Sequence, residues 1–314
     1  MKPIRRILHF VNGNLDAGPS FERAAAIARK SGAALTLLAV MDKLPREWMR
    51  LVPSQGVDRV VEAAALELRG RLERLAADAE LHTALVRTKV LLGRPLDRVL
   101  EEVENGGYDL VTVDASARPR LLSPWRVDVC KRLMQACPAP VLVLRNTRIF
   151  RRVLAAVNPG SLQRNGSVPS RAVLEVAASI ASAEGSDLHI VYCWDVAASY
   201  LPSAPASLPP RHLTHMLVTE RRTARVAMRN LLAGIGLVGV KPVIHLRRGE
   251  PAKLIPQIAA SLRADLVVMG MPARAGVRGF LFGNLTEDVY RTVDCPMVTV
   301  SCSSYSPPGQ SRAA

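Results

Sequence analysis

The chain has 314 residues, which is too long for one typical core and suits two domains of about 150 residues each. Apolar residues make up 49% and aromatic residues only 4%, which favours helices packed closely on sheets, and no apolar run approaches the roughly 18 residues that span a membrane. The formal net charge of +15 would attract anions such as nucleotides, RNA or acidic lipid, although it names no partner.

The five cysteines are odd in number and show no spacing typical of a zinc site or a disulfide framework. The N-terminal residues lead directly into a short strand-like stretch, without the pattern of a signal peptide. We therefore expect a cytoplasmic protein with no membrane anchor.

The two halves of the sequence repeat one plan. Segment 5–12, RRILHFVN, matches segment 151–158, RRVLAAVN. The motif at 93–95, GRP, and the run at 109–113, DLVTV, recur 156 residues later as GEP and DLVVM. We also align the CPAPVLVL run from Cys137 with the CPMVTV run from Cys295. The repeat predicts an N-terminal domain over 1–147 and a C-terminal domain over 148–302.

Both halves alternate short β-branched runs with longer helical patterns, and Gly32 and Gly185 stand at equivalent helix ends. In the second half we expect strands near 151–157, 187–193, 241–246, 265–270 and 297–301. Helices are expected near 168–184, 211–235, 251–263 and 284–293, the first with Val173, Val176, Ala177 and Ile180 on one face. The pattern predicts two tandem doubly wound, Rossmann-like α/β domains, each with a mostly parallel five-stranded sheet flanked by helices.

Three segments fall outside this regular pattern. The stretch from Ala197 to Pro210 is rich in alanine, serine and proline and is a candidate flap. Trp48 and Met49 are interpreted as lid-packing residues rather than as a hydrophobic ligand site. The tail over 303–314 lacks core-forming residues and is predicted to be disordered.

The loop after the fourth strand of the second half, 270–284, is the candidate chemical site, since ligands of doubly wound sheets bind beyond the carboxyl ends of the strands. Its glycines can turn backbone amides toward an anion, and Gly283-Asn284 leads into a helix whose N-terminus favours phosphate. Arg274 and Arg278 would add positive charge. By itself, such a loop is also an ordinary strand-to-helix connection.

This loop resembles the phosphate-binding signature of the universal stress protein superfamily, G-x2-G-x9-G-[S/T]. Here the pattern is Gly270-x2-Ala273-x9-Gly283-Asn284, so Ala273 stands at the second glycine and Asn284 at the Ser/Thr position. The likeness covers nearly all of both halves, as in the tandem two-domain members. It implies that the protein is a stress-response regulator that binds ATP or a related adenine nucleotide, alone or with Mg²⁺.

Carried over by position, the resemblance implies a binding set in the second half. The residues Gly270, Ala273, Gly283 and Asn284 would face the triphosphate. Arg274, for its charge, and Leu285, the first residue of the helix, complete the predicted cofactor-binding set. The adenosine pocket would include Ala156, Asn158 and Cys193, with Met269 under the nucleotide. Asn158 stands where the family usually has Asp, and its amide can both accept and donate a hydrogen bond.

In the first half the equivalent loop begins with Asp114 and contains no glycine up to Trp125. A carboxylate in place of Gly270 would repel phosphate, so we expect a degenerate copy with a structural or partner-binding role. The other polar residues are interpreted as structural. His212 and His215 are expected on a solvated helix face, His9, His189 and His245 as satisfied strand histidines, and Cys137, Cys193 and Cys295 as small hydrophobic residues.

Three functions stay open at this point. The favoured one is a nucleotide-binding regulator with an unknown protein partner. The second is a slow ATPase using Asn284, Arg274 and Mg²⁺, although the Walker, pyrophosphatase and HxGH motifs are missing from the sequence. The third is a basic scaffold for RNA or acidic proteins, for which base-stacking aromatic residues are not evident.

Assembly is predicted from the last strands of the two halves. Runs 141–144 and 297–300 each end a sheet as an apolar edge, and such edges are normally covered or paired. The resemblance implies that the halves form an intramolecular pseudo-dimer through these strands. The whole chain is then a monomer or a homodimer.

Overall fold

The computed structural model describes residues 3–11, 19–42, 54–78, 85–115, 129–145, 149–159, 170–194, 210–235, 237, 239–271 and 285–301. The chain divides into two compact units, Pro3–Ile149 and a unit that runs from Phe150 onward. The division between Ile149 and Phe150 lies close to the domain boundary expected after residue 147. The candidate flap up to residue 209, Trp48, Met49 and the tail over 303–314 lie outside the described residues.

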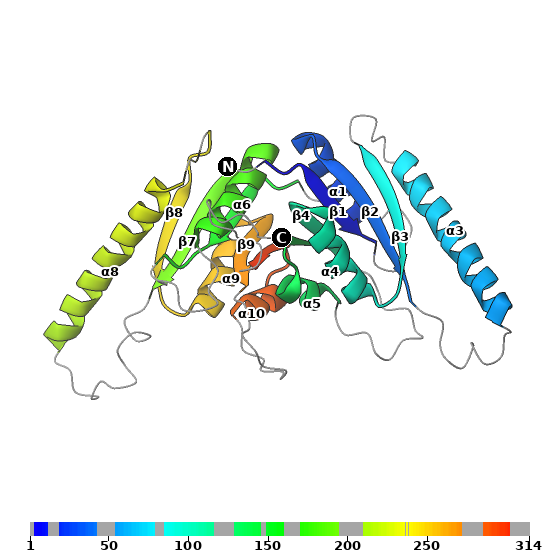
Figure 1. The fold of residues 1–314 in the computed structure, drawn as a ribbon. Coiled ribbons are helices and arrows are strands. Elements are labelled where there is room, and N and C mark those ends of the chain that lie inside the picture. Colours follow the sequence, from blue (N-terminus) through cyan, green and yellow to red (C-terminus); the bar gives the residue numbers. More distant parts are fainter. Residues whose placement is uncertain are drawn as a thin grey trace. The chain divides into compact units, whose positions relative to one another are not determined.

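The first unit alternates strands and helices from its start (Figure 1). Its elements are β1 (Arg6–Phe10), α1 (Pro19–Ser31), β2 (Ala34–Met41), α3 (Ser54–Asp78), β3 (Val86–Leu92), α4 (Pro95–Gly106), β4 (Leu110–Asp114), α5 (Val129–Ala136) and β5 (Val141–Leu144). The strand order is β3-β2-β1-β4-β5, and each neighbouring pair is parallel.

The second unit repeats this arrangement. Its elements are β6 (Arg152–Ala156), α6 (Ser170–Glu184), β7 (Asp187–Trp194), α8 (Pro210–Ala233), β8 (Val243–Arg248), α9 (Pro251–Leu262), β9 (Leu266–Met271), α10 (Leu285–Thr292) and β10 (Met297–Ser301). The order is β8-β7-β6-β9-β10, again with parallel neighbours. Right-handed crossovers place α6 and α8 on one face of the sheet, and α9 and α10, which contact each other, on the opposite face.

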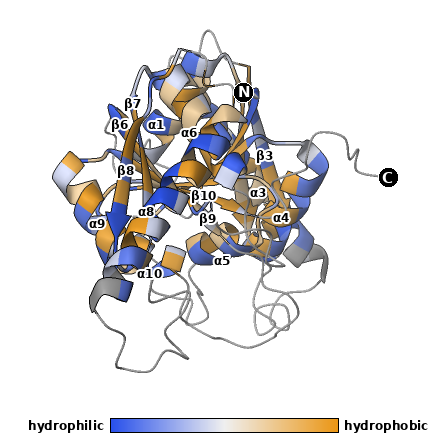
Figure 2. Cartoon of the chain, turned by 90° about the vertical axis from the view of Figure 1, so that its left-hand side faces the viewer, coloured by the Kyte–Doolittle hydropathy of each residue, from blue (hydrophilic) through white to orange (hydrophobic). Residues whose placement is uncertain are grey.

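The core of each unit lies between its sheet and the helices. The central strands are hydrophobic and the helices carry polar residues away from the sheet (Figure 2). On α6, Val173, Ala177 and Ile180 are buried as predicted, whereas Val176 is only half-buried. Ala178 and Ala181 are buried as well, so small residues let this helix approach the sheet closely.

These observations confirm the predicted fold class of two tandem Rossmann-like α/β domains. Every strand and helix expected in the second half is present, with ends that differ from the expectation by two residues at most. The glycines at the ends of α1 and α6 have φ of +64° and +70°, as expected for helix C-caps. Across the described residues, no helix has the length and apolar character needed to cross a membrane.

One aspartate at the start of β4 and one at the start of β9 fix the central strands. The carboxylate of Asp109 accepts hydrogen bonds from the backbone amides of Arg5 and Arg6 at 3.0 and 3.1 Å. Asp265 accepts equivalent bonds from Arg151 and Arg152, both at 3.0 Å. The repeated sequence therefore encodes the same strand pairing in both units.

The glycines of the GRP and GEP motifs turn the chain from the third strand into the following helix. Gly93 and Gly249 have φ of +137° and +130°, a region that side-chain-bearing residues rarely adopt. Pro95 and Pro251 then occupy the first helical turn, where a missing N–H costs nothing. This explains why Gly and Pro recur 156 residues apart.

The alignment of Cys137-Pro138 with Cys295-Pro296 is wrong by two residues. Val111 donates its backbone N–H to the carbonyl of Pro140 at 2.9 Å, and Val267 donates to Pro296 at 3.1 Å. Pro140, rather than Pro138, is thus the counterpart of Pro296. The offset of 156 residues persists through the last helix and strand, and the Cys-Pro pairs coincide by composition but not by position.

Candidate functional site

The carboxyl ends of β6 and β9 lie next to each other in the second unit. Ala156, the last residue of β6, is the register partner of Met269 in β9. The chain leaves β6 toward β7 and leaves β9 toward β10, in opposite directions across the sheet. This is the topological switch point, where open α/β sheets bind their ligands.

The first turn of α10 is attached to the end of β9. The hydroxyl of Thr286 donates a hydrogen bond to the carbonyl oxygen of Gly270 at 2.8 Å, and Thr286 is almost fully buried. Leu285, beside it, is half-buried. This bond holds the N-terminus of an α-helix, with its unpaired amides, at the switch point.

An acidic side chain in the same turn is neutralised locally. Glu287 is buried and would oppose a bound anion at this helix end. Its Oε1 accepts a hydrogen bond from Nη2 of Arg291, one turn later, at 2.8 Å. The ion pair with Arg291 compensates the charge of this carboxylate within the helix.

The segment after β6 approaches the start of α6. The backbone amide of Asn158 donates to Oγ of Ser170 at 3.1 Å, while the Asn158 side chain is exposed. A second helix N-terminus is thereby placed close to the end of β6. Asn158 thus lies on the exposed side of this segment, at the carboxyl end of β6.

The remaining described members of the predicted set differ in exposure. Cys193 is half-buried near the end of β7, and burial raises the pKa of its thiol to about 11, with Arg247 partly offsetting the rise. Met269 is only 3% exposed, so it can form the floor of a site but not its rim. None of the four described cysteines forms a disulfide.

At the switch point the structure therefore brings together four of the predicted residues, Ala156, Met269, Gly270 and Leu285. Asn158 lies in the segment that follows β6, and Cys193 lies on the adjoining strand β7. Ala273, Arg274, Gly283 and Asn284 lie outside the described residues. Sequence reasoning missed the roles of Thr286 and Ser170. Their signal was a hydroxyl side chain in the first turn of a helix, which commonly bonds to nearby backbone.

At the equivalent place in the first unit, polar groups of the protein bond to one another. Asp114, the counterpart of Gly270, accepts a hydrogen bond from Oγ of Ser20 at 2.8 Å. Cys130, the counterpart of Thr286, lies with Sγ 3.5 Å from the Asp114 carbonyl oxygen. The carboxylate is thus held by the first turn of α1, at the end of the strand where the second unit has a glycine.

His9 lies in the core of the first unit. Its Nδ1 is 2.9 Å from Oγ1 of Thr112, and its ring packs at 5.9 Å from that of Phe21. Burial lowers the pKa of His9 to about 4, and the nearby Asp114 offsets this only in part. The interpretation of His9 as a satisfied core histidine is confirmed.

Comparison with known proteins identifies the family. The Universal stress protein family profile matches residues 3–145 and again residues 150–301. The chain belongs to the universal stress protein family. Two matches in one polypeptide make it a tandem member, as the internal repeat predicted.

Among relatives, this universal stress protein is similar to the universal stress protein E homolog of Haemophilus influenzae, with 29% identity over 66% of each chain. It is also similar to universal stress protein E of Salmonella typhi, with 22% identity over 98% of each chain.

Two solved structures share the fold. A functionally unknown protein from Pseudomonas aeruginosa PAO1 has a TM-score of 0.64 and 22% identity, covering 96% of this chain and 94% of that one. A universal stress protein from Archaeoglobus fulgidus has a TM-score of 0.60 and 17% identity, covering 94% and 96%.

Proposed function

We propose that this tandem universal stress protein is a cytoplasmic regulator whose second unit binds ATP or a related adenine nucleotide. The observation that carries the proposal is the hydrogen bond from Thr286 to Gly270, which holds the N-terminus of α10 at the switch point beside Ala156 and Met269. An anionic ligand is the chemistry that such a helix end recognises.

The proposed phosphate site combines this helix end with the signature loop. Backbone amides near Gly283 and Asn284 would hold the triphosphate, and Arg274 would add a positive charge. Ala273 carries a Cβ where the signature has glycine, so we expect the phosphates to lie closer to Gly270 and Gly283.

The adenosine would lie over the ends of β6 and β7. Ala156 offers a small apolar contact, and the exposed side chain of Asn158 can hydrogen-bond to ribose or base. Cys193 lies farther along the adjoining strand, as a neutral thiol at physiological pH because its pKa is raised to about 11. Met269 would support the nucleotide from below.

In this proposal the first unit does not bind nucleotide. Asp114 would place a negative charge against phosphate, and Ser20 already uses the carboxylate as an acceptor. The first unit would instead serve as a structural or partner-binding copy. Strands β5 and β10 are each the last strand in the sheet of their own unit. Pairing of the units through these strands stays a prediction, and it is tested by producing each half of the chain separately.

Isothermal titration calorimetry of the full chain with ATP, ADP and AMP tests the function directly. We expect one site per chain for at least one of these nucleotides. Absence of binding for all three would overturn the proposal and favour the basic scaffold, which RNA binding would then test. Phosphate release in the presence of Mg²⁺ separates a regulator from a slow ATPase.

A further inference from the structure

Two histidines of the second unit face each other across neighbouring strands. Nδ1 of His189 in β7 lies 3.1 Å from Nε2 of His245 in β8. In the strand register His245 is opposite Val191, so the two histidines are diagonal neighbours on one face of the sheet. Both rings are half-buried, which leaves them accessible from solvent.

The spacing of these two nitrogens suits a shared metal ion. Two imidazole nitrogens bound to one ion at about 2.0–2.1 Å lie about 2.9 Å apart in the square-planar coordination that copper(II) prefers and about 3.3 Å apart in tetrahedral coordination. The observed 3.1 Å lies between these values without any change in the strands. We propose that His189 and His245 form a two-imidazole site for a late first-row transition metal ion, with copper bound most tightly.

The protonation of the pair supports metal binding. Burial lowers the pKa of both imidazoles; Asp187 partly offsets this at His189, whereas the neighbouring ring and Arg247 lower the pKa of His245 further. Neutral rings keep their lone pairs available near pH 7. A bound ion would take the place of the proton shared between the rings, and that proton would move through solvent to the other nitrogen of its own ring, which stays neutral.

The ligand type, together with the charge around it, restricts which ion can bind. Arg152 and Arg247 contribute positive charge near the rings, and Asp187 contributes negative charge. A hard ion such as Mg²⁺, which prefers oxygen ligands, gains little from two imidazoles beside these cations. Copper and zinc form strong bonds to imidazole nitrogen and are therefore favoured.

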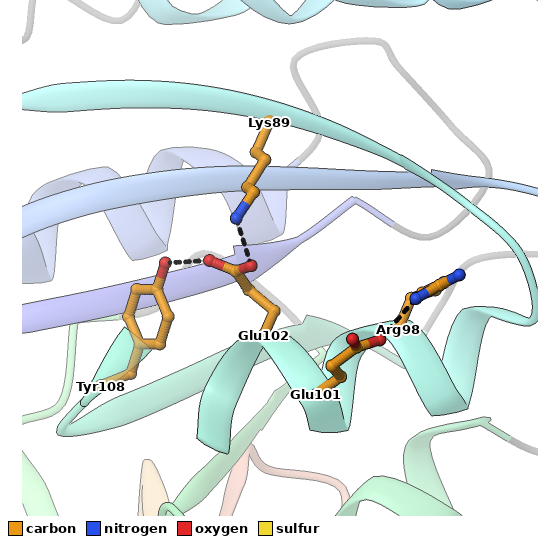
Figure 3. Close-up of polar contacts among 5 residues, drawn as sticks. All are labelled: Lys89, Arg98, Glu101, Glu102 and Tyr108. Atoms are coloured by element: carbon orange, nitrogen blue, oxygen red, sulfur yellow. Dashed lines mark hydrogen bonds and ion pairs between the residues drawn. The ribbon is translucent and has the colours of Figure 1, made fainter. Parts of the chain in front are cut away.

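The first unit uses the same place for a different purpose. Lys89 and Thr36 are the counterparts of His245 and His189 by strand register. Nζ of Lys89 lies 2.5 Å from one oxygen of Glu102, and the Tyr108 hydroxyl donates to the other at 2.9 Å (Figure 3). Lys89, Glu102 and Tyr108 thus form a network of one ion pair and one hydrogen bond that contains no imidazole.

In the second unit all parts of that network have changed together. Ile258 and Ala264 occupy the positions of Glu102 and Tyr108, 156 residues later. The carboxylate and the phenol are lost, and two metal-binding side chains face each other instead. Among the described residues no group of three or more His, Cys, Asp or Glu side chains could hold a metal, so the pair supplies two ligands and water completes the coordination.

Electron paramagnetic resonance of the full chain tests this site. The protein is stripped of metal and titrated with one equivalent of copper(II) sulfate at pH 7.5, and affinity is measured by competition with a chelator. We expect nitrogen hyperfine structure from two imidazoles. His189→Gln and His245→Gln should each weaken copper binding by about tenfold or more, since even the loss of an outer-shell partner costs about 10–100-fold.

The matched control uses the other close pair of histidines. His212 and His215 are exposed on α8 and three residues apart, a spacing that can also chelate metal. The double variant His212→Ala/His215→Ala should bind copper as tightly as the unmodified protein. Unchanged binding in the His189 variant, or loss of binding in the α8 variant, would overturn the site. Circular dichroism of both glutamine variants checks that the fold is retained. Copper is also titrated into the double variant His189→Asn/His245→Asn, which lacks both imidazoles.

Discussion

The hydroxyl of Thr286 donates to the carbonyl oxygen of Gly270 at 2.8 Å, joining the first turn of a helix to the end of a central strand. The first unit has a thiol at the same position: Sγ of Cys130 lies 3.5 Å from the Asp114 carbonyl oxygen. In both units the first turn of the last helix is thus bonded to the end of the fourth strand. The residue at that strand end differs: it is an aspartate in the first unit and a glycine in the second.

Replacing Thr286 by valine should weaken nucleotide binding. The change keeps the side-chain shape and removes a buried hydrogen bond worth about 0.5–1.5 kcal/mol, so the helix end is held less firmly at the switch point. We expect ATP affinity to fall about three- to tenfold, as measured by calorimetry. The free energy of unfolding of the second unit should fall by about 1 kcal/mol in chemical denaturation.

Cys130→Ala provides the control for this prediction because it alters the equivalent attachment in the first unit. ATP affinity should stay unchanged in this variant. Equal losses in both variants would mean that the measured effect reflects general destabilisation and not the site.

Gly283→Val should abolish ATP binding while the circular dichroism spectrum stays the same. A β-branched side chain at the helix entrance would block phosphate from the backbone amides. Retained affinity in this variant would show that the phosphates bind elsewhere.

Calorimetry should give one nucleotide site per chain. Gly270 and Gly283 belong to the second unit, whereas the first unit has Asp114 hydrogen-bonded to Ser20. Asp114→Asn removes the charge and should leave the stoichiometry at one, because the loop up to Trp125 contains no glycine. Two equivalent sites in the unmodified protein would contradict the asymmetry.

The order of the strands and helices could be predicted because each element carries a local sequence pattern, and the internal repeat shows these patterns twice. Gly93 and Gly249 mark the same turn, and Asp109 and Asp265 start the same strand. The alignment of Cys137 with Cys295 was wrong because it followed the shared Cys-Pro motif and not the constant spacing of 156 residues between the two halves.

Contacts between side chains distant in sequence could not be predicted. His189 and His245 meet only because β7 and β8 pair in one particular register. The two histidines are 56 residues apart, and the short runs of sequence around them do not show which residues of the two strands lie opposite each other. The hydrogen bond between Ser20 and Asp114 depends in the same way on how α1 packs against the sheet.

Tyr108→Phe should destabilise the first unit by about 1 kcal/mol, because it removes the hydrogen bond to one carboxylate oxygen of the half-buried Glu102, while Lys89 still contacts the other oxygen. Glu101→Gln is the control on the same helix (Figure 3). It breaks the pair with Arg98, in which both side chains are well exposed, so its effect should be within about 0.5 kcal/mol. Urea denaturation measures both changes, and a larger loss in the Glu101 variant would contradict the ranking.

The stability of the first unit should depend on pH through His9. The folded state lowers the pKa of His9 from 6.5 to about 4, whereas the unfolded chain takes up a proton near pH 6.5. Between these values the unfolded state binds more protons, so stability rises with pH across the window and is lost as pH falls toward 4. The full loss is about 3 kcal/mol.

His9→Gln can keep a hydrogen bond to Thr112 and cannot titrate, so its stability should fall less between pH 6.5 and 4 than that of the unmodified protein. Denaturation curves at several pH values measure the difference, and parallel pH profiles for the two proteins would show that His9 is not the titrating group.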